Sequence, residues 1–248
     1  MKFSSTFRAR LQEAHCIVAF TGAGMSAESG VPTFRGEDGI WKKFKPEELA
    51  NFDAFIRNPD LVWEWYAHRK KVISSIQPNS GHYALAQMGT LFSEVHVITQ
   101  NIDNLHRRAG SQQVYELHGN IERNYCIDCR TPFTNEQLDL GAGVPKCARC
   151  GGLIRPDVVW FGELLPVDAW ERSVEVCEHA DLFFSIGTSG IVYPAASLPA
   201  VARRSGAYVV EINPEHTMLS DAVDETLIGK AGEILPKVVY LIKERLHH

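Results

Sequence analysis

The chain lacks any long apolar run. None of its 248 residues lies in a stretch of about 18 or more apolar residues, the length that a membrane-spanning helix needs. Its first residues, MKFSSTFRARLQEAHCIVAF, also lack a long apolar segment before a small-residue cleavage site, the pattern of a secretory signal. We therefore expect a cytoplasmic protein without a membrane partner.

Positive charge is not in excess either. The sequence has 25 lysines and arginines against 30 aspartates and glutamates, a net charge of −5. A protein held mainly by nucleic-acid phosphates or an anionic membrane surface needs the opposite balance, so direct nucleic-acid binding is not expected. Because 45% of the residues are hydrophobic, the chain can bury a full core. We expect one large domain with, at most, a small insertion.

Cysteine is scarce, yet four of the six cysteines fall close together. The four are Cys126, Cys129, Cys147 and Cys150. Two residues intervene within each pair and 17 between the pairs, the spacing of two knuckles around one tetrahedral zinc. Four thiolates leave no open position for water, so we expect one structural zinc; four thiols without metal are the alternative. Cys16 and Cys177 lie in apolar surroundings and are predicted to be core residues.

Apolar runs of strand length recur along the chain, at residues 16–24, 94–100, 181–189 and 207–213. Helical stretches separate several of them: one begins after Asn58-Pro59, and residues 231–246 are typical of a closing helix. This alternation predicts an α/β fold with a Rossmann-like parallel sheet, whose ligands bind beyond the carboxyl ends of the strands. Residues 120–155, with paired cysteines and little periodicity, predict a smaller inserted zinc-binding module.

A glycine-rich turn follows the first predicted strand. In TGAGMSAESG, residues 21–30, glycine lets backbone N–H groups approach a pyrophosphate near a helix start. The turn is not the full dinucleotide fingerprint, because Ala27 stands where the third glycine belongs. A tight connection without ligand is the alternative.

Read together, several motifs identify the chain as resembling the sirtuins, the NAD-dependent protein lysine deacylases. They are GAGMSAESGVPTFRG (22–36), TQNIDNLHRRAG (99–110), ELHGN (116–120), the two cysteine pairs, RPDVVWFGE (155–163), GTSGIVYPAA (187–196) and INPE (212–215). The resemblance covers about residues 10–235 and is closest to the bacterial desuccinylase and demalonylase branch. It implies one catalytic domain over residues 1–248. The large Rossmann-like part would comprise about residues 8–34, 82–121 and 156–246, and the small zinc and helical module about 35–81 and 122–155.

The resemblance also implies a cleft in which NAD, as co-substrate, meets an acyl-lysine. Arg35 would pair with the diphosphate and Phe34 would shield the reacting ribose carbon. The implied NAD-binding residues are Gly22, Ala23, Gly24, Phe34, Arg35, Trp41, Gln100, Asn101, Asp103, Gly187, Thr188, Ser189, Asn213, Glu215 and Ala231. An ordinary polar turn after a strand is the alternative for Asn101 and Asp103.

His118, in ELHGN, is the implied catalytic base, since an imidazole titrating near neutrality can accept a proton from a ribose hydroxyl. The resemblance implies attack of the acyl oxygen on the ribose carbon, and products that are nicotinamide, free lysine and an O-acyl-ADP-ribose. No hydride moves, and zinc takes no part in the chemistry. The remaining histidines at 82, 96 and 106 have no comparable context.

Two residues on one predicted helix indicate which acyl group the substrate carries. Tyr66 and Arg69 stand at i and i+3, so a phenol and a guanidinium can meet one carboxylate. In the sirtuins a Tyr-x-x-Arg here marks enzymes that prefer malonyl, succinyl or glutaryl lysine; Ala50 would leave room for the longer chain, and Thr33 agrees with that branch. The alternative is that Tyr66 packs while Arg69 pairs with Glu64 or another surface acid.

The partners implied are acylated proteins or peptides, bound as an extended strand between residues 160–163 and 190–194. Plain deacetylation is expected alongside the acidic acyl activity. Two other functions stay open: an NAD-dependent protein ADP-ribosyltransferase, and a zinc-ribbon module that binds nucleic acid. The second leaves the α/β domain unexplained and lacks a dense basic and aromatic stripe.

Overall fold

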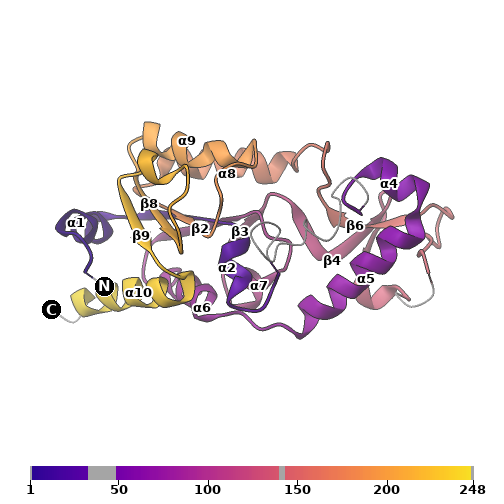
Figure 1. Cartoon of the computed structure of the whole chain (residues 1–248), viewed down its shortest axis with the longest axis horizontal. Coiled ribbons are helices and arrows are strands. Elements are labelled where there is room, and N and C mark those ends of the chain that lie inside the picture. The colour runs from indigo at the N-terminus through magenta and orange to yellow at the C-terminus, as the bar shows by residue number, and fades with distance from the viewer. Residues whose placement is uncertain (1, 33–48, 140–142, 247–248) are drawn as a thin grey trace.

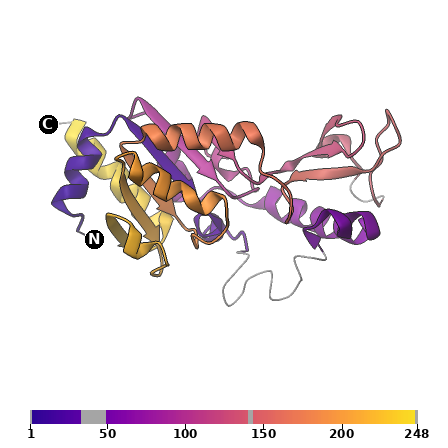
Figure 2. The same ribbon diagram turned by 90° about the horizontal axis from the view of Figure 1, so that it is seen from above.

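The computed structural model describes residues 2–32, 49–139 and 143–246. Two parts lie side by side along the long axis of the molecule, and both termini lie at the end of the large part away from the small one (Figure 1). Seen from above, the small part extends from one end of the large part (Figure 2). The helices of the described residues are all too short or too polar to cross a membrane.

The large part is built on a six-stranded sheet of order β3-β2-β1-β7-β8-β9. The strands are β1 (Cys16–Thr21), β2 (Glu94–Thr99), β3 (Gln113–Glu116), β7 (Leu182–Ile186), β8 (Tyr208–Asn213) and β9 (Glu225–Ile228). Every neighbouring pair is parallel. The chain winds outward from β1 in one direction and from β7 in the other, so the sheet has its topological switch point between these two strands, where α/β proteins bind ligands.

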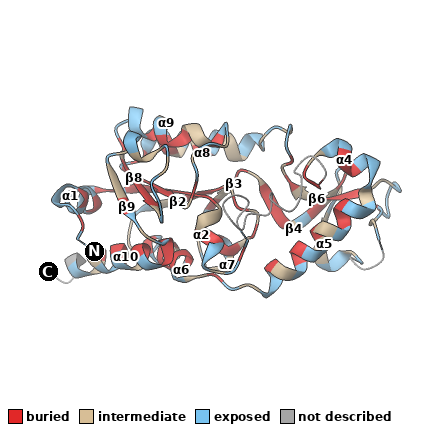
Figure 3. Ribbon diagram, viewed as in Figure 1, coloured by how far each residue is buried: buried red, intermediate tan, exposed pale blue. Residues whose placement is uncertain are grey.

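Helices cover both faces of this sheet (Figure 1). The helices on one face are α1 (Ser5–Glu13), α2 (Ala23–Ala27), α6 (Ser80–Met88) and α10 (Ala231–Leu246); those on the other are α8 (Val167–His179) and α9 (Leu198–Arg204). Burial follows these layers, with the inner strands buried and the outer helix faces exposed (Figure 3). β1 and β7 are buried at every position, and they are mostly apolar rather than alternating, as expected of strands buried on both faces.

The smaller part carries a three-stranded antiparallel sheet of order β5-β4-β6, with β4 (Gly119–Cys126), β5 (Pro132–Thr134) and β6 (Ile154–Val158). Against it pack α4 (Phe52–Arg57) and α5 (Pro59–Ser75). The Lys70 ammonium joins α5 to β4, since it donates to Asn124 Oδ1 at 2.9 Å and Asn135 Oδ1 at 2.8 Å. Burial lowers the pKa of Lys70 to about 7.

The predicted fold class is confirmed, a Rossmann-like parallel sheet with a smaller module that brings four cysteines together. The four predicted strands are β1, β2, β7 and β8, and the predicted helices are α5, capped by Asn58, and α10. The exact division of residues between the two parts stays a prediction. Burial raises the pKa of Cys16 to about 11 and that of Cys177 to about 12, as expected of core thiols.

Candidate active site

One cavity of about 560 Å³ lies between the carboxyl ends of the strands and the smaller part. It brings together most of the site residues predicted from the sequence. These are Gly22, Ala23, Gly24, Ala50, Tyr66, Arg69, Gln100, Asn101, His118, Gly187, Thr188, Ser189, Asn213 and Glu215. Other lining residues were not predicted: Trp65, Ile102, Val158, Val159, Leu165, His216 and Thr217. Thr33, Phe34, Arg35 and Trp41 lie outside the described residues.

The glycine turns meet at the switch point of the sheet. Gly24 N donates to Gly187 O at 2.8 Å, and Gly22 N donates to Ile186 O at 3.0 Å. A Cβ on Gly24 would lie 2.7 Å from the Gly187 Cα, and Gly187 itself has φ +58°. These glycines are therefore required because two backbones touch. Since the amides of Gly22 and Gly24 are used within the protein, a diphosphate would meet other donors of this turn.

The side-chain amides of Gln100 and Asn101 lie beside the glycine turn, and we call them the floor of the cavity. Gln100 Nε2 donates to Thr188 Oγ1 at 3.0 Å, and Asn101 Nδ2 donates to Gly22 O at 2.9 Å. Both bonds link the end of β2 to the loops that follow β1 and β7. The floor is thereby held in place before any ligand arrives, as recognition of a polar ligand requires.

His118 lines the cavity from the turn between β3 and β4. Its Nδ1 lies 2.9 Å from Gln100 O. Because a carbonyl oxygen can only accept, Nδ1 carries the hydrogen and Nε2 keeps its lone pair in the neutral ring. Burial lowers the pKa of His118, and the bond to the Gln100 carbonyl partly opposes this. The ring is therefore neutral and able to accept a proton at physiological pH.

Behind the floor lies a buried polar network that the sequence did not reveal. Ser26 Oγ lies 3.2 Å from Asn101 Nδ2 and 3.4 Å from His82 Nε2. The ring centroids of His82 and His106 are 4.8 Å apart. Burial lowers the pKa of His82 to about 4, so this ring stays neutral. Lone histidines carry no pattern in sequence, and only the tertiary structure joins these two to the site.

Two predicted NAD-binding residues do not line the cavity. Asp103 is buried and accepts from Leu105 N at 3.0 Å, and burial raises its pKa. Ala231 is buried at the first residue of α10, facing Gly81 of α6. Direct contact of either residue with a ligand stays a prediction.

The end of the cavity in the smaller part is formed by Tyr66, Arg69 and Trp160. Tyr66 is 3% and Arg69 8% exposed, and the Arg69 guanidinium carbon lies 4.6 Å from the centroid of the Trp65 ring. Tyr66 OH accepts from Trp160 Nε1 at 2.8 Å. Burial raises the pKa of Tyr66 to about 12, so the phenol keeps its proton. Arg69 is buried and lines the cavity rather than lying at the surface. Its role in binding an acyl group stays a prediction.

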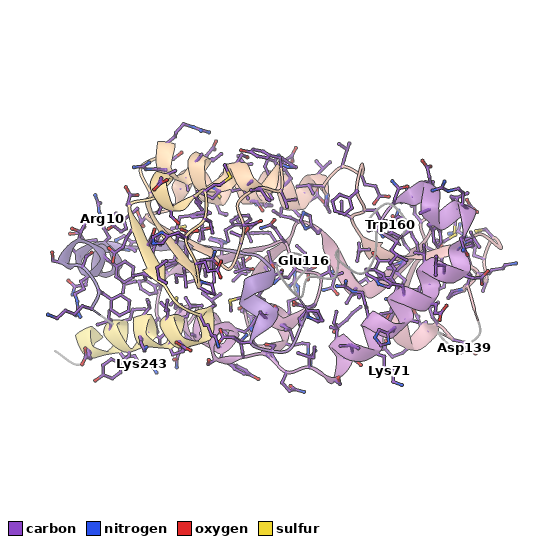
Figure 4. The ribbon with its side chains drawn as sticks, viewed as in Figure 1. Arg10, Lys71, Glu116, Asp139, Trp160 and Lys243 are labelled. Atoms are coloured by element: carbon purple, nitrogen blue, oxygen red, sulfur yellow. The ribbon has the colours of Figure 1, made fainter. Side chains whose placement is uncertain are left out.

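An ion pair between the buried Arg155 and the partly buried Glu163 contacts Trp160. The Arg155 guanidinium carbon lies 3.4 Å from the Trp160 ring centroid, and Arg155 Nη2 donates to Glu163 Oε2 at 2.9 Å. The same carboxylate oxygen accepts from Trp160 N at 2.8 Å. Trp160 lies inside the smaller part near α4 (Figure 4). The position of Tyr66 therefore depends on Arg155 and Glu163, which the sequence places in RPDVVWFGE without indicating their contact.

The opposite end of the cavity is lined by Asn213 and Glu215, after β8. The loop that follows them is held by the buried Glu211 carboxylate, which accepts from the hydroxyls of Thr217 and Ser220. Carboxylate and amide groups at a strand end are suited to bind ribose hydroxyls.

The four cysteines of the smaller part fit a tetrahedral metal. Their sulfurs all lie within 4.8 Å of one another. Cys126 Sγ is 3.5 Å from Cys150 Sγ, and Cys129 Sγ is 3.6 Å from Cys147 Sγ. Four ligands at the Zn–S distance of about 2.3 Å would be separated by about 3.8 Å. Since no fifth ligand or open position is implied, the site is suited to structural zinc.

Removing this zinc will unfold the smaller part. The module has a small apolar core, and the metal joins both knuckles, so we expect loss of the metal to cost a large share of the about 10–16 kcal/mol typical of such sites. The emission of the Trp63 and Trp160 indoles, both buried in that core, will shift to longer wavelength on chelation. Cys177→Ser, which alters a thiol far from the module, will keep its zinc. A native Trp spectrum after complete zinc removal would contradict the prediction.

Comparisons with known proteins agree with this geometry. The model of the Sir2 family matches residues 22–194. The chain is 52% identical over 229 residues to an NAD-dependent protein deacylase of Aquifex aeolicus, covering 92% of this chain and 96% of the relative. It is 51% identical over 232 residues to NAD-dependent protein deacylase 2 of Pyrobaculum aerophilum, covering 94% and 92%.

Two solved structures are also similar. A Sir2 homologue in complex with NAD has a TM-score of 0.92 and 44% identity, and covers 99% of this chain and 96% of its own. A complex of Sir2 with a p53 peptide and NAD⁺ has a TM-score of 0.89 and 35% identity, and covers 100% of both chains.

Proposed function

Because the chain belongs to the Sir2 family, we propose that it removes acyl groups, acidic ones above all, from protein lysines and consumes NAD in doing so. The proposal is supported by the cavity of about 560 Å³, which is lined by His118, by Asn213 and Glu215, and by Tyr66 and Arg69. In the proposal, the neutral imidazole would act between a nucleotide bound near Asn213 and Glu215 and an acyl chain bound near Tyr66 and Arg69. A site that bound only a nucleotide, or only an acyl chain, would not require both groups of residues in one cavity.

The residues around the switch point would hold the dinucleotide. Asn213 and Glu215 would bind the adenosine ribose, the turn at residues 22–24 the diphosphate, and Gln100 with Asn101 the ribose that bears nicotinamide. Contacts from residues 34, 35 and 41 belong to the same proposal. Bound NAD would supply a ribose carbon that becomes electrophilic as nicotinamide leaves.

His118 would act on a hydroxyl of that ribose. Its Nδ1–H is tied to Gln100 O, so the lone pair of Nε2 is the part of the ring able to take a proton. Removing the hydroxyl proton makes the oxygen a nucleophile, and the resulting imidazolium can return the proton later in the reaction. The hydrogen bond to a fixed carbonyl also keeps the ring from turning its other nitrogen toward the ribose.

Tyr66 and Arg69 would select an acyl group that ends in a carboxylate. The Tyr66 oxygen already accepts from Trp160, so its own hydrogen is directed to a further acceptor. An arginine fork and a phenol hydroxyl together match the oxygens of a malonyl or succinyl carboxylate. Acetyl-lysine fits sterically but brings no charge to Arg69, so deacetylation would persist at a lower rate.

The acyl-lysine would reach the cavity from an extended peptide. Residues 160–163 and 192–194 line the cavity. Phe161 and Tyr193 are 48% and 75% exposed, which leaves apolar surface for the peptide beside the opening. Backbone pairing with an extended segment would tolerate many sequences. The zinc would only hold the module, and a cytoplasmic location for this reaction stays a prediction.

Nicotinamide release and peptide mass together test the proposal. The native chain will be incubated with NAD and peptides that carry acetyl-, malonyl- or succinyl-lysine. We expect loss of the acyl mass with one nicotinamide released per lysine freed, and faster turnover of the acidic acyl groups. A gain of ADP-ribose mass on protein would instead support the transferase. No nicotinamide release with any peptide would refute both.

A further inference from the structure

A second group of metal-ligating side chains lies at the other end of the sheet. Cys16 begins β1 and pairs in register with Glu94, the first residue of β2. Side chains alternate along a strand, so His96, two residues after Glu94, emerges on the same face as both. A sulfur of Cys16, a carboxylate oxygen of Glu94 and a ring nitrogen of His96 all lie within 4.8 Å of one another. The active-site cavity lies at the opposite, carboxyl ends of these strands.

We propose that Cys16, Glu94 and His96 bind one zinc ion, at a site separate from the four cysteines. Thiolate, imidazole and carboxylate are the three donors that zinc accepts, and three protein ligands leave a fourth position for water. Zn–S and Zn–N distances of about 2.3 and 2.0 Å place tetrahedral ligands about 3.5 Å apart. The three donor atoms lie within 4.8 Å of one another, so the site requires them to move closer to that spacing.

The histidine is already oriented for the role. Its Nε2 lies 3.4 Å from Glu94 Oε2, while Nδ1 lies 3.2 Å from the Tyr115 hydroxyl. The Tyr115 and His96 rings are stacked, with centroids 5.9 Å apart and an interplanar angle of 17°. A bond from Nδ1–H to the tyrosine oxygen leaves Nε2 as the donor atom, the arrangement usual for metal-bound histidine.

Hydrogen bonds to Asp181 fix the backbone of Cys16. Asp181 Oδ2 accepts from Cys16 N at 2.9 Å and from His15 N at 2.7 Å, which fixes the backbone that carries the thiol. The Asp181 carboxylate also adds negative charge beside the site. A divalent cation placed there would face anionic groups of the folded chain.

An ion can reach this site from solvent. The Glu94 side chain is 63% exposed and the His96 side chain 12%, with Cys16 beneath them at 7%. On binding, the Cys16 thiol loses its proton to solvent and the sulfur bonds the ion, whose charge is unchanged. One thiolate and one carboxylate then balance the two charges of zinc. Because the site exists only when β1 and β2 are paired, the ion binds the folded state, and the stabilisation grows with the logarithm of the free zinc concentration above the Kd.

Zinc stoichiometry tests the proposal. His247 and His248 are replaced by alanine in every protein tested, including the otherwise native chain, so that the tail binds no metal. Each protein, with zinc kept at its four cysteines, is then equilibrated with buffered free zinc. We expect two zinc ions per native chain. Glu94→Gln, which changes an exposed carboxylate, and His96→Gln will hold one at the same free zinc, with the second ion bound at least about tenfold more weakly.

Cobalt identifies the ligands. Added Co²⁺ will give the charge-transfer absorption of a cobalt thiolate in a chain that holds zinc only at the four cysteines, and Cys16→Ser will abolish it. His15→Gln, the adjacent exposed histidine, is the matched control and will bind both metals as the native chain does. The proposal is overturned by one zinc per native chain, by two in Glu94→Gln and His96→Gln, by a cobalt band that survives Cys16→Ser, or by an equal loss in His15→Gln.

Discussion

Arg69→Met will lower removal of succinyl and malonyl groups far more than removal of acetyl. Arg69 is buried beside Tyr66 in the cavity. Without its guanidinium, a substrate carboxylate bound there would lack both a charge partner and water. Removing one partner of a buried, hydrogen-bonded charge pair costs about 2–5 kcal/mol, which is about thirtyfold or more in kcat/KM. The measurement is kcat/KM for nicotinamide release with succinyl-, malonyl- and acetyl-lysine peptides of one sequence.

The acetyl peptide is the internal control, because it needs the same NAD site and the same His118. Lys71→Met is the matched variant, since it removes one positive charge from the same helix at an exposed position. We expect Lys71→Met to leave all three activities unchanged. Equal losses for the acetyl and succinyl peptides in Arg69→Met would mean that Arg69 only supports the module.

His118→Ala will abolish most deacylation while NAD binding is largely kept. A general base contributes about 10²- to 10⁴-fold to the rate. The His118 ring lines the cavity but is not among the residues proposed to bind the adenosine ribose, so its loss should change NAD binding little. Turnover of a succinyl-lysine peptide and the Kd of NAD, from calorimetry, give the two quantities. His179→Ala is the control, because His179 also bonds a backbone carbonyl through Nδ1, at 2.8 Å, but is exposed on α8. Full activity of His118→Ala would remove this residue from the mechanism.

The pH profile of the native chain carries the same information. Only the neutral ring accepts a proton, so kcat/KM falls as the pH drops through the pKa of His118. Burial lowers that pKa, and the activity will therefore persist to more acidic pH than the ordinary histidine value of about 6.5 would allow. An acidic limb centred above this value would contradict the role assigned to the buried ring.

Much of the fold could be predicted from the sequence because the inner strands are buried on both faces. The strands β1, β7 and β8 are short, mostly apolar runs, which is the pattern of strands buried in a parallel sheet. The edge strands β3 and β9 were missed, since each has only four residues and is partly exposed. Their strand character depends on pairing with β2 and β8, which local sequence does not encode.

Some residues of the candidate site could likewise be predicted from the sequence, while the contacts between others could not. The zinc ligands follow from spacing alone, because the metal dictates it. The glycine turn was predicted to approach a pyrophosphate, which stays a prediction; the close contact that the structure shows is with Gly187 of the protein itself, far along the chain. Likewise, the contact of Arg155 with Trp160 and the pairing of His82 with His106 exist only after folding.

The apolar cluster of the smaller part contains Tyr66 and Trp160 together with the zinc ligands Cys126 and Cys147. The metal therefore shares a packing unit with the residues that we propose recognise the acyl group. If that proposal holds, we expect zinc starvation in the cell to remove acyl-lysine binding together with the smaller part, while the nucleotide-binding end of the cavity remains folded.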